Sequence, residues 1–166
     1  MAVMLSKRVL GGFEDLARHQ FPSNLGILEQ VLLWFDSLYP EKCPNKSYSP
    51  HIPSLVWQQC KLALVEGFTN AVRHAHKNYD REIPPVEIEV KLLSEYLELR
   101  IWDRGKAFNL QETLEKRVQE VDNQTEGGRG LILLDKMADK LSYEPVETGR
   151  NCLLFIKYYQ PQQQLN

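Results

Sequence analysis

The sequence predicts an α+β fold, a two-layer α/β sandwich in which a mostly antiparallel sheet carries helices on one face. Two observations predict it. The first half of the chain repeats apolar residues at helical spacing, whereas the second half is rich in alternating strand patterns. The predicted strands follow one another through short turns, and their alternation fits a sheet with one covered and one solvated face. The length of 166 residues fits a single domain over residues 1–166.

The composition is that of an ordinary globular protein, with 43% hydrophobic and 25% charged residues. The formal net charge of -2 gives no basic excess for direct binding of nucleic acid or of an anionic membrane. Cys43, Cys60 and Cys152 stand far apart without a CxxC pair, which fits a reducing compartment better than a disulfide framework or a zinc site. No apolar run reaches the length of a membrane span, and the N-terminus turns polar too early for a secretory signal. We therefore expect a cytoplasmic protein.

The first part of the chain predicts one clear helix. Residues 1–12 are expected to be loosely ordered, with a break at Gly11-Gly12, and residues 13–20 fit either a short helix or a first edge strand. Apolar residues then recur at helical spacing over residues 25–38, after a Pro-Ser-Asn helix entry. Four prolines over residues 40–53 predict a connecting loop.

The middle of the chain predicts a long helix and a hairpin. The helix runs from Ser54 to about Lys77. Two alternating runs follow, VEIEVKL at residues 86–92 and YLELRIW at residues 96–102, and together they predict an antiparallel hairpin. Residues 109–126 are polar and charged, with only a weak helical stripe.

The last third contains a glycine-rich loop, TEGGRG, at residues 125–130, which opens directly into a helical stripe at residues 131–141. Strands are predicted at residues 141–146 and 152–159, separated by a Thr-Gly-Arg-Asn turn. The glutamine-rich end, residues 160–166, is expected to be frayed.

The long helix carries the first candidate residues for chemistry. Glu66 and Asn70 stand four residues apart, so their side chains lie on the same side of the helix. They fit a partly solvated helix face, or a general base beside an amide oxygen that binds a hard cation such as magnesium. His74 and His76 stand two residues apart, so we do not expect them to bind a metal together. Cys60 on the same helix is expected in the core rather than as a nucleophile.

Asp103 and Gly105 form the second candidate, at the end of the second hairpin strand. Asp-x-Gly at a strand end is typical of a turn. The alternative is a carboxylate that accepts a hydrogen bond from an exocyclic amine, while Gly105 lets a base approach the backbone.

The glycine-rich loop is the third candidate, through Gly128, Arg129 and Gly130. Glycines before a helix let backbone N–H groups face a phosphate, the helix N-terminus favours negative charge, and Arg129 can add a charge-assisted contact. A plain helix-entry loop fits equally well. The loop matches neither GxxxxGK[ST] nor a full GxGxxG fingerprint.

The order of these three motifs carries a resemblance that none of them carries alone. E-x-x-x-N on a helix, D-x-G-x-x-F after a strand and G-G-R-G-L opening a helix resemble the N, G1 and G2 boxes of the Bergerat-fold (GHKL) ATPase superfamily. Within it, LALVEGFTNAVRHAH is most similar to the anti-sigma-factor serine kinases of the RsbW type, and the chain length also fits that branch. The resemblance covers roughly residues 54–157.

The resemblance implies a Bergerat ATP-binding fold, ATP and magnesium as ligands, and a role for each matching residue. Glu66 corresponds to the glutamate that activates the attacking hydroxyl group, and Asn70 to the magnesium ligand. The ATP-binding positions are Asn70, Asp103, Gly105, Gly128, Arg129, Gly130 and, more loosely, Thr148. Among these, Asp103 corresponds to the aspartate that reads the adenine amino group. Residues 109–126 correspond to a mobile lid over the triphosphate.

The resemblance also implies an activity and partners. It implies an ATP-dependent protein serine/threonine kinase that phosphorylates a STAS-type anti-anti-sigma antagonist. The same protein would sequester a sigma factor, usually as a homodimer, and so regulate transcription.

Two departures from the family pattern keep alternatives open. Ala107 replaces the second glycine of the usual D-x-G-x-G, and the connection over residues 40–53 is longer than usual. The first alternative is a nucleotide-gated protein-binding module without kinase activity. The others are a detached histidine-kinase catalytic domain and an α+β domain that binds no nucleotide.

Overall fold

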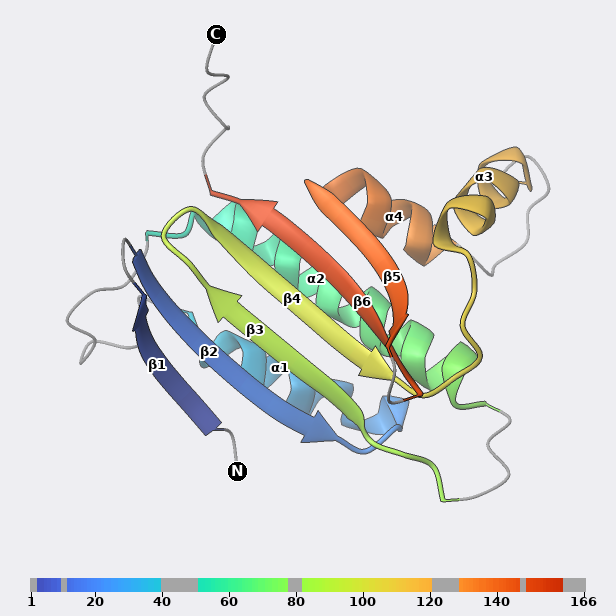
Figure 1. Ribbon diagram of the computed structural model, residues 1–166, viewed down its shortest axis with the longest axis horizontal. Coiled ribbons are helices and arrows are strands. Elements are labelled where there is room, and N and C mark those ends of the chain that lie inside the picture. Colours follow the sequence, from blue (N-terminus) through green and yellow to red (C-terminus); the bar gives the residue numbers. More distant parts are fainter. Residues whose placement is uncertain are drawn as a thin grey trace, which may run out of the picture.

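The described part of the computed structural model comprises residues 3–9, 12–39, 51–77, 82–120, 129–146 and 149–159. These residues form a six-stranded sheet in the order β1-β2-β3-β4-β6-β5, in which every neighbouring pair is antiparallel (Figure 1). The strands are β1 (Val3–Val9), β2 (Gly12–Phe21), β3 (Val86–Leu92), β4 (Tyr96–Asp103), β5 (Lys140–Val146) and β6 (Arg150–Tyr158). The helices are α1 (Leu28–Asp36, entered by the 3-10 turn η1, Leu25–Ile27), α2 (Ser54–Asn70), the π-helical η3 (Ala71–Ala75), α3 (Leu110–Glu120) and α4 (Arg129–Met137).

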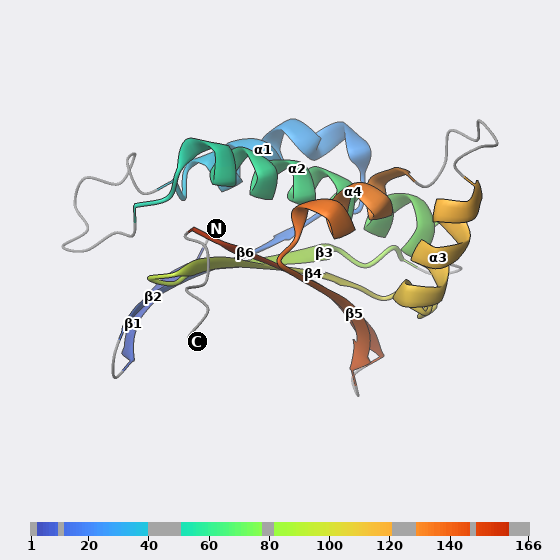
Figure 2. The same cartoon turned by 90° about the horizontal axis from the view of Figure 1, so that it is seen from above.

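The helices α1, α2 and α4 lie over the same face of the sheet, which curves away from them at both edges (Figure 2). Phe35 of α1 stacks on Trp57 of α2 with ring centroids 4.2 Å apart, and this pair joins the two helices. The predicted α+β architecture, with an antiparallel sheet covered by helices on one face, is therefore confirmed. No helix in these described ranges is both long and apolar enough to cross a membrane.

The helix α2 packs directly on the centre of the sheet. A Cβ atom at Gly67 would lie 2.3 Å from Cδ1 of Ile101 on β4 and 3.0 Å from Cδ2 of Leu153 on β6. A larger residue would therefore require the Ile101 and Leu153 side chains to repack. This close packing brings the C-terminal end of α2 next to the end of β4, where the candidate residues of the hairpin lie.

The N-terminal predictions need correction. The loosely ordered segment expected over residues 1–12 is wrong for Val3–Val9, which forms strand β1 and pairs with β2. Val9 pairs with Gly12, so the predicted break lies where the chain reverses between two strands. The undecided segment 13–20 belongs to a strand, but β1 takes the edge position and β2 lies inside the sheet.

The face of the sheet opposite the helices carries charged residues, which the sequence predicts to be exposed to solvent. Several of them are nevertheless buried. Glu87, Glu89 and Glu98 are only 8%, 4% and 8% exposed. Arg18 of β2 donates a hydrogen bond of 2.7 Å to Glu89, and Arg100 Nε lies 2.8 Å from a Glu98 oxygen. Long charged side chains cover one another here, across neighbouring strands in the Arg18–Glu89 pair and along β4 in the Arg100–Glu98 pair. This burial depends on cross-strand register, which the alternating pattern of one strand does not contain.

The central helix changes its hydrogen-bonding pattern at Ala71. The helix predicted over residues 54–77 is α-helical as far as Asn70, and η3 then continues it as a π-helix. The His76 N–H group donates to the Ala71 carbonyl oxygen at 3.1 Å, which closes this wider turn. Such π turns are often found at functional sites.

The later elements follow the predictions with shifted ends. Asn109 caps α3: its Oδ1 accepts from the Glu112 N–H at 3.1 Å, and its amide nitrogen donates to the Glu112 carboxylate at 3.1 Å. The helix α4 ends at Met137 rather than at Leu141, because Leu141 belongs to β5 and pairs with Phe155. The turn before β6 contains Gly149, whose φ of 68° lies in the left-handed region. Of the loop predicted over residues 40–53, residues 51–53 are neither helix nor strand, whereas residues 40–50 lie outside the described residues, as does the tail over residues 160–166 that is predicted to be frayed.

Candidate functional site

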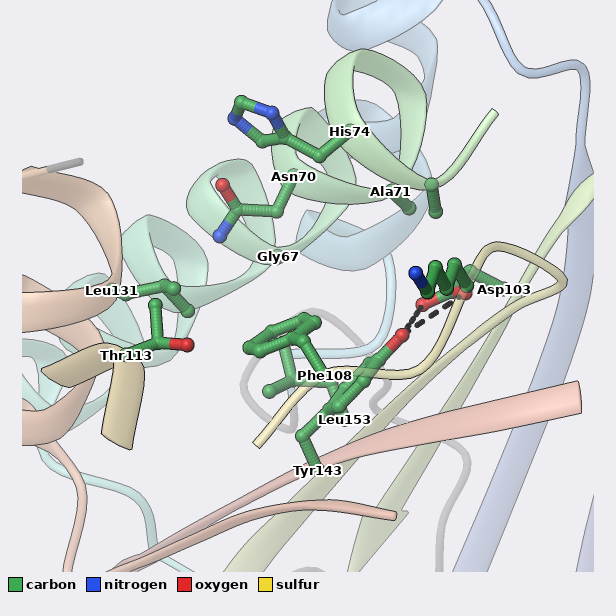
Figure 3. Close-up of a pocket in the computed structure, with 12 residues that line it drawn as sticks. Gly67, Asn70, Ala71, His74, Asp103, Phe108, Thr113, Leu131, Tyr143 and Leu153 are labelled. Carbon is green, nitrogen blue, oxygen red and sulfur yellow. Dashed lines mark hydrogen bonds between the residues drawn. The ribbon is translucent and has the colours of Figure 1, made fainter. Parts of the chain in front are cut away.

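A cavity of about 300 Å³ opens at the C-terminal end of α2 (Figure 3). One wall comes from α2 and η3, and the rest from β4, β5, β6, α3, α4 and the connection after β4. Its volume is at the lower end of the range for small-molecule pockets. The lining residues are Gly67, Asn70, Ala71, His74, Ala75, Asp103, Lys106, Phe108, Thr113, Leu131, Tyr143 and Leu153.

Asp103 is a buried carboxylate in the wall of this cavity, only 6% exposed. Its Oδ1 accepts hydrogen bonds from the Gly105 N–H at 2.9 Å and from Asn151 Nδ2 at 2.8 Å. The Tyr143 hydroxyl lies 3.2 Å from Oδ1 and 3.1 Å from Oδ2. Among the described residues, Oδ1 therefore has two donors of its own and shares the Tyr143 hydroxyl with Oδ2, which has no other donor there and keeps the capacity to accept from a ligand. The Gly105 contact is an Asx turn, so the turn predicted at this strand end is also present.

Gly105 allows the connection after β4 to run directly against η3. A Cβ atom at Gly105 would lie 2.4 Å from Ala75 Cα and 2.7 Å from the Ala75 carbonyl oxygen. Because both of these are backbone atoms, any side chain at this position would force the helix and the connection apart. The group that approaches Gly105 in this structure is thus the backbone of η3.

His76 holds the same connection from inside the protein. The side chain is 2% exposed, and its Nε2 accepts a hydrogen bond of 3.1 Å from the Arg104 N–H. Its Nδ1 lies 2.8 Å from the Ser23 hydroxyl oxygen. Burial lowers the pKa of His76, and the nearby charge of Asp103 opposes this effect. His74, by contrast, is exposed and lines the cavity, so the two histidines lie in different environments.

Two aromatic rings form the wall beside Asp103. Phe108 stacks on Tyr143 with ring centroids 4.3 Å apart and an interplanar angle of 23°. Burial raises the pKa of the Tyr143 hydroxyl, and the neighbouring Asp103 charge raises it further. The hydroxyl therefore stays protonated at neutral pH. An apolar wall with a few convergent polar groups is typical of a site for a planar organic ligand.

Asn70 supplies an unsatisfied polar group on the α2 side. The residue lines the cavity, and its Nδ2 atom is buried without a hydrogen-bond partner among the described residues. An unpaired buried polar group carries a desolvation penalty, which a phosphate oxygen accepting from it would relieve. The oxygen of the same amide is a ligand of the type that magnesium prefers. The residues present therefore fit a nucleotide with its metal ion.

Glu66 lies against the first turn of α4. A Cβ atom at Gly130 would come within 2.2 Å of Glu66 Oε2, so only glycine leaves room for this carboxylate. Arg129, the first residue of α4, is exposed. Gly130 and the catalytic candidate Glu66 are thus neighbours in space, although the sequence separates them by more than a third of the chain.

The structure brings most of the predicted site residues together. Asn70 and Asp103 line one cavity, Gly105 packs against η3 in its wall, and Gly130 packs on Glu66. Gly128 and Thr148, predicted as ligand contacts, lie outside the described residues.

Sequence reasoning missed Tyr143 and Asn151, which both contact Asp103. The pairing of β4 with β6 places Asn151 directly opposite Asp103, and Asn151 also donates to the Gly105 carbonyl oxygen at 2.9 Å. The sequence motifs instead predicted a contact from Thr148, three residues earlier in the chain. Only the register of the two strands distinguishes these positions, and that register is not visible in a local motif.

Cys60 lies in the core, as predicted, with 0% exposure. Burial raises the pKa of its thiol to about 12, so the thiol stays protonated at neutral pH. A protonated, inaccessible thiol is a poor nucleophile, which agrees with the structural role expected for it.

Comparison with known proteins agrees with this geometry. Residues 47–157 match the model of the histidine kinase-like ATPase domain family. The chain is 30% identical over 92 residues to the serine-protein kinase RsbW of Bacillus pumilus (strain SAFR-032), which covers 52% of this chain and 57% of that protein. It is 29% identical over 90 residues to the serine-protein kinase RsbW of Staphylococcus aureus (strain JH9), which covers 51% of this chain and 56% of that protein.

The match to these curated relatives spans about half of this chain and little more than half of their length. The resemblance to the RsbW type is confirmed, and the family model covers the larger share of the chain, including every described residue of the cavity. The chain therefore belongs to the histidine kinase-like ATPase domain family.

Proposed function

We propose that this protein is an ATP-dependent protein serine/threonine kinase and an anti-sigma factor. The observation that carries the proposal is the convergence of three predicted residues. Asn70 and Asp103 line one cavity, and Glu66 lies at the first turn of α4, where its neighbour is Gly130. Membership of the histidine kinase-like ATPase family supports ATP as the ligand of this cavity.

The adenine base would bind between the aromatic wall and α2. Asp103 would accept a hydrogen bond from the exocyclic amine through Oδ2, the oxygen with fewer partners. Phe108, Leu131 and Leu153 supply apolar lining for the ring. Lys106 and His74 also line the cavity.

The phosphate end would lie toward α4. Asn70 would hold magnesium through its amide oxygen, a sparse role that fits a metal otherwise bound by phosphates and water. When bound, magnesium neutralises the charge of the phosphates. Arg129 and Gly130 begin α4, and a helix N-terminus with its free N–H groups favours a phosphate. Gly128 would contribute to the same loop, and Thr148 would contact the adenine side.

Glu66 would act as the general base. Phosphoryl transfer needs positioning and charge neutralisation more than covalent chemistry from the protein. Glu66 would accept the proton of the serine or threonine hydroxyl as that oxygen attacks the terminal phosphorus atom. Because Gly130 has no side chain, the Glu66 carboxylate can lie against the first turn of α4.

The resemblance to the RsbW type suggests the partners. We propose a STAS-type anti-anti-sigma protein as phosphate acceptor and a sigma factor as the sequestered partner, bound by a homodimer of this chain. Phosphorylation would release the antagonist and leave the kinase free to hold the sigma factor.

A nucleotide-gated binding module without kinase activity is the second candidate. Ala107 favours this alternative, because it replaces the usual second glycine of the motif. Ala107 is exposed in the connection that follows Asp103. Under this alternative the protein would bind ATP and its partner but would transfer no phosphate.

A phosphotransfer assay with radiolabelled ATP and candidate STAS proteins separates the two. Wild type is expected to label a STAS protein on serine or threonine, and Glu66→Ala is expected to lose transfer while it still binds ATP. Glu95→Ala is the matched control, because Glu95 is exposed in the turn between β3 and β4. ATP binding without transfer by wild type would favour the binding module. Acid-labile phosphate on histidine would indicate a histidine kinase instead.

A further inference from the structure

The Tyr143 hydroxyl has a fixed place in the cavity beside Asp103 (Figure 3). It reaches both oxygens of the carboxylate, at 3.2 Å and 3.1 Å, from strand β5. The stacked ring of Phe108 limits rotation of the Tyr143 ring, with centroids 4.3 Å apart. The position of the hydroxyl is thus set by packing as well as by its hydrogen bonds.

The two oxygens of the Asp103 carboxylate differ in their hydrogen-bond donors. Oδ1 accepts from the Gly105 N–H and from Asn151, two donors that are parts of the fold. Within the part of the chain that the structure describes, Oδ2 has only the Tyr143 hydroxyl, which also lies 3.2 Å from Oδ1. A tyrosine hydroxyl has one proton and rotates easily about its C–O bond, so its donor can be redirected to a ligand. Asp103 Oδ2 then regains its acceptor capacity for the same ligand.

These two atoms therefore present an acceptor and a donor side by side, 3.1 Å apart. The Watson–Crick edge of adenine carries the complementary pair, an amino donor at N6 and an acceptor at N1, on neighbouring ring atoms. We propose that Tyr143 reads N1 of the adenine base by donating its hydroxyl proton, while Asp103 accepts from the 6-amino group. This inference rests on the proposed function, because it adds a specificity-determining residue to the same nucleotide site.

The alternative for Tyr143 is a purely positioning role, in which its hydroxyl only holds the Asp103 carboxylate in place. Both roles predict weaker ATP binding by Tyr143→Phe, so this variant alone does not separate them. An ATP analogue with N1 replaced by a C–H group (1-deaza-ATP) does, because it keeps the amino group for Asp103 and removes only the acceptor for Tyr143.

The test is calorimetric titration of ATP and 1-deaza-ATP, each with magnesium, into wild type and Tyr143→Phe. One neutral hydrogen bond corresponds to roughly a fivefold difference in affinity. We expect wild type to bind ATP about fivefold more tightly than 1-deaza-ATP, and Tyr143→Phe to bind both equally. Tyr158→Phe is the matched control: Tyr158 pairs with Tyr96 at the far end of β4 and β6 and should leave the wild-type ratio unchanged.

The outcomes are distinct. If Tyr143→Phe weakens both nucleotides by the same factor, the hydroxyl only positions Asp103, and the inference is wrong although the proposed function stands. If wild type itself binds ATP and 1-deaza-ATP with equal affinity, N1 contributes nothing to binding and the inference is wrong. If folded wild type binds no ATP, the proposed function and this inference fail together.

Discussion

Asn151 and Asp103 face each other across strands β4 and β6 and share a hydrogen bond of 2.8 Å. Both side chains are buried, with 3% and 6% exposure. Asn151 uses the same amide nitrogen to reach the Gly105 carbonyl oxygen at 2.9 Å. One side chain on the last strand therefore holds both the carboxylate and the connection that follows it.

Replacing this amide tests its structural role. Asn151→Ala removes one of the donors to the buried Asp103 carboxylate and the donor to the Gly105 carbonyl oxygen, so we expect the free energy of unfolding to fall by about 2 kcal/mol. Asn151→Asp should lose more, because it sets a second carboxylate against Asp103 in a buried site. Denaturant unfolding of the three proteins measures both effects. If Asn151→Ala unfolds with the same free energy as wild type, Asn151 does not have this structural role.

The contact between Gly105 and η3 predicts a steric effect at the site. In Gly105→Ala the new methyl group meets the Ala75 backbone at 2.4 Å, so we expect about 1–3 kcal/mol lower stability together with weaker ATP binding. Gly149→Ala is the matched control, since no atom of the described residues, its chain neighbours aside, lies within 4 Å of its Cβ position. Its φ of 68° predicts a loss of about 1 kcal/mol from backbone strain, with ATP affinity retained. Equal effects of the two variants on ATP affinity would contradict the close packing at Gly105.

The contact between Gly130 and Glu66 predicts an effect on phosphate transfer. The methyl group of Gly130→Ala would come within 2.2 Å of the end of a flexible side chain, so Glu66 should turn away at little cost in stability. We expect the transfer rate at saturating ATP to fall by about tenfold or more, since a displaced base catalyses poorly. If the effect acts through Glu66, adding Gly130→Ala to Glu66→Gln should cause no further loss. Additive losses in the double variant would show that Gly130 acts in another way.

His76 predicts a dependence of stability on pH. Its pKa is lowered from the ordinary 6.5 by burial, so below about pH 6.5 the unfolded chain binds a proton that the folded protein resists. The free energy of unfolding should therefore fall as the pH drops below about 6.5, and the fall should level off below the folded-state pKa. Unfolding of wild type and His76→Gln from about pH 8 to about pH 5 measures this, with a flatter profile expected for the variant. Identical profiles would mean that other groups cause the dependence.

Local patterns predicted the elements that have strong periodicity. The hairpin of β3 and β4, the helix α2 and the hairpin of β5 and β6 follow from alternation, helical spacing and turn residues. Strand β1 has no such alternation, and it forms by pairing with β2, the next strand of the chain, in a register that runs from Val9–Gly12 to Val3–Arg18. The π turn at Ala71 is likewise absent from the sequence pattern, which reads as one continuous helix.

The site was predictable where its residues form motifs. Glu66, Asn70, Asp103 and Gly130 stand in recognisable local spacings, and the structure brings them to one end of α2. Tyr143 and Asn151 belong to no motif, and their contacts with Asp103 arise only when β5 and β6 take their places in the sheet. These contacts depend on the register of the paired strands, which a local motif does not contain.

The most direct test of the central claim is calorimetric titration of ATP with magnesium into wild type and Asp103→Asn. The substitution keeps the shape of the side chain but replaces one acceptor oxygen with a donor amide, which faces the adenine amino group unfavourably. We predict binding of wild type in about the micromolar range and a loss of at least about tenfold in the variant. Failure of folded wild type to bind ATP, or equal affinities of the two proteins, would contradict the assignment of this cavity as an adenine site.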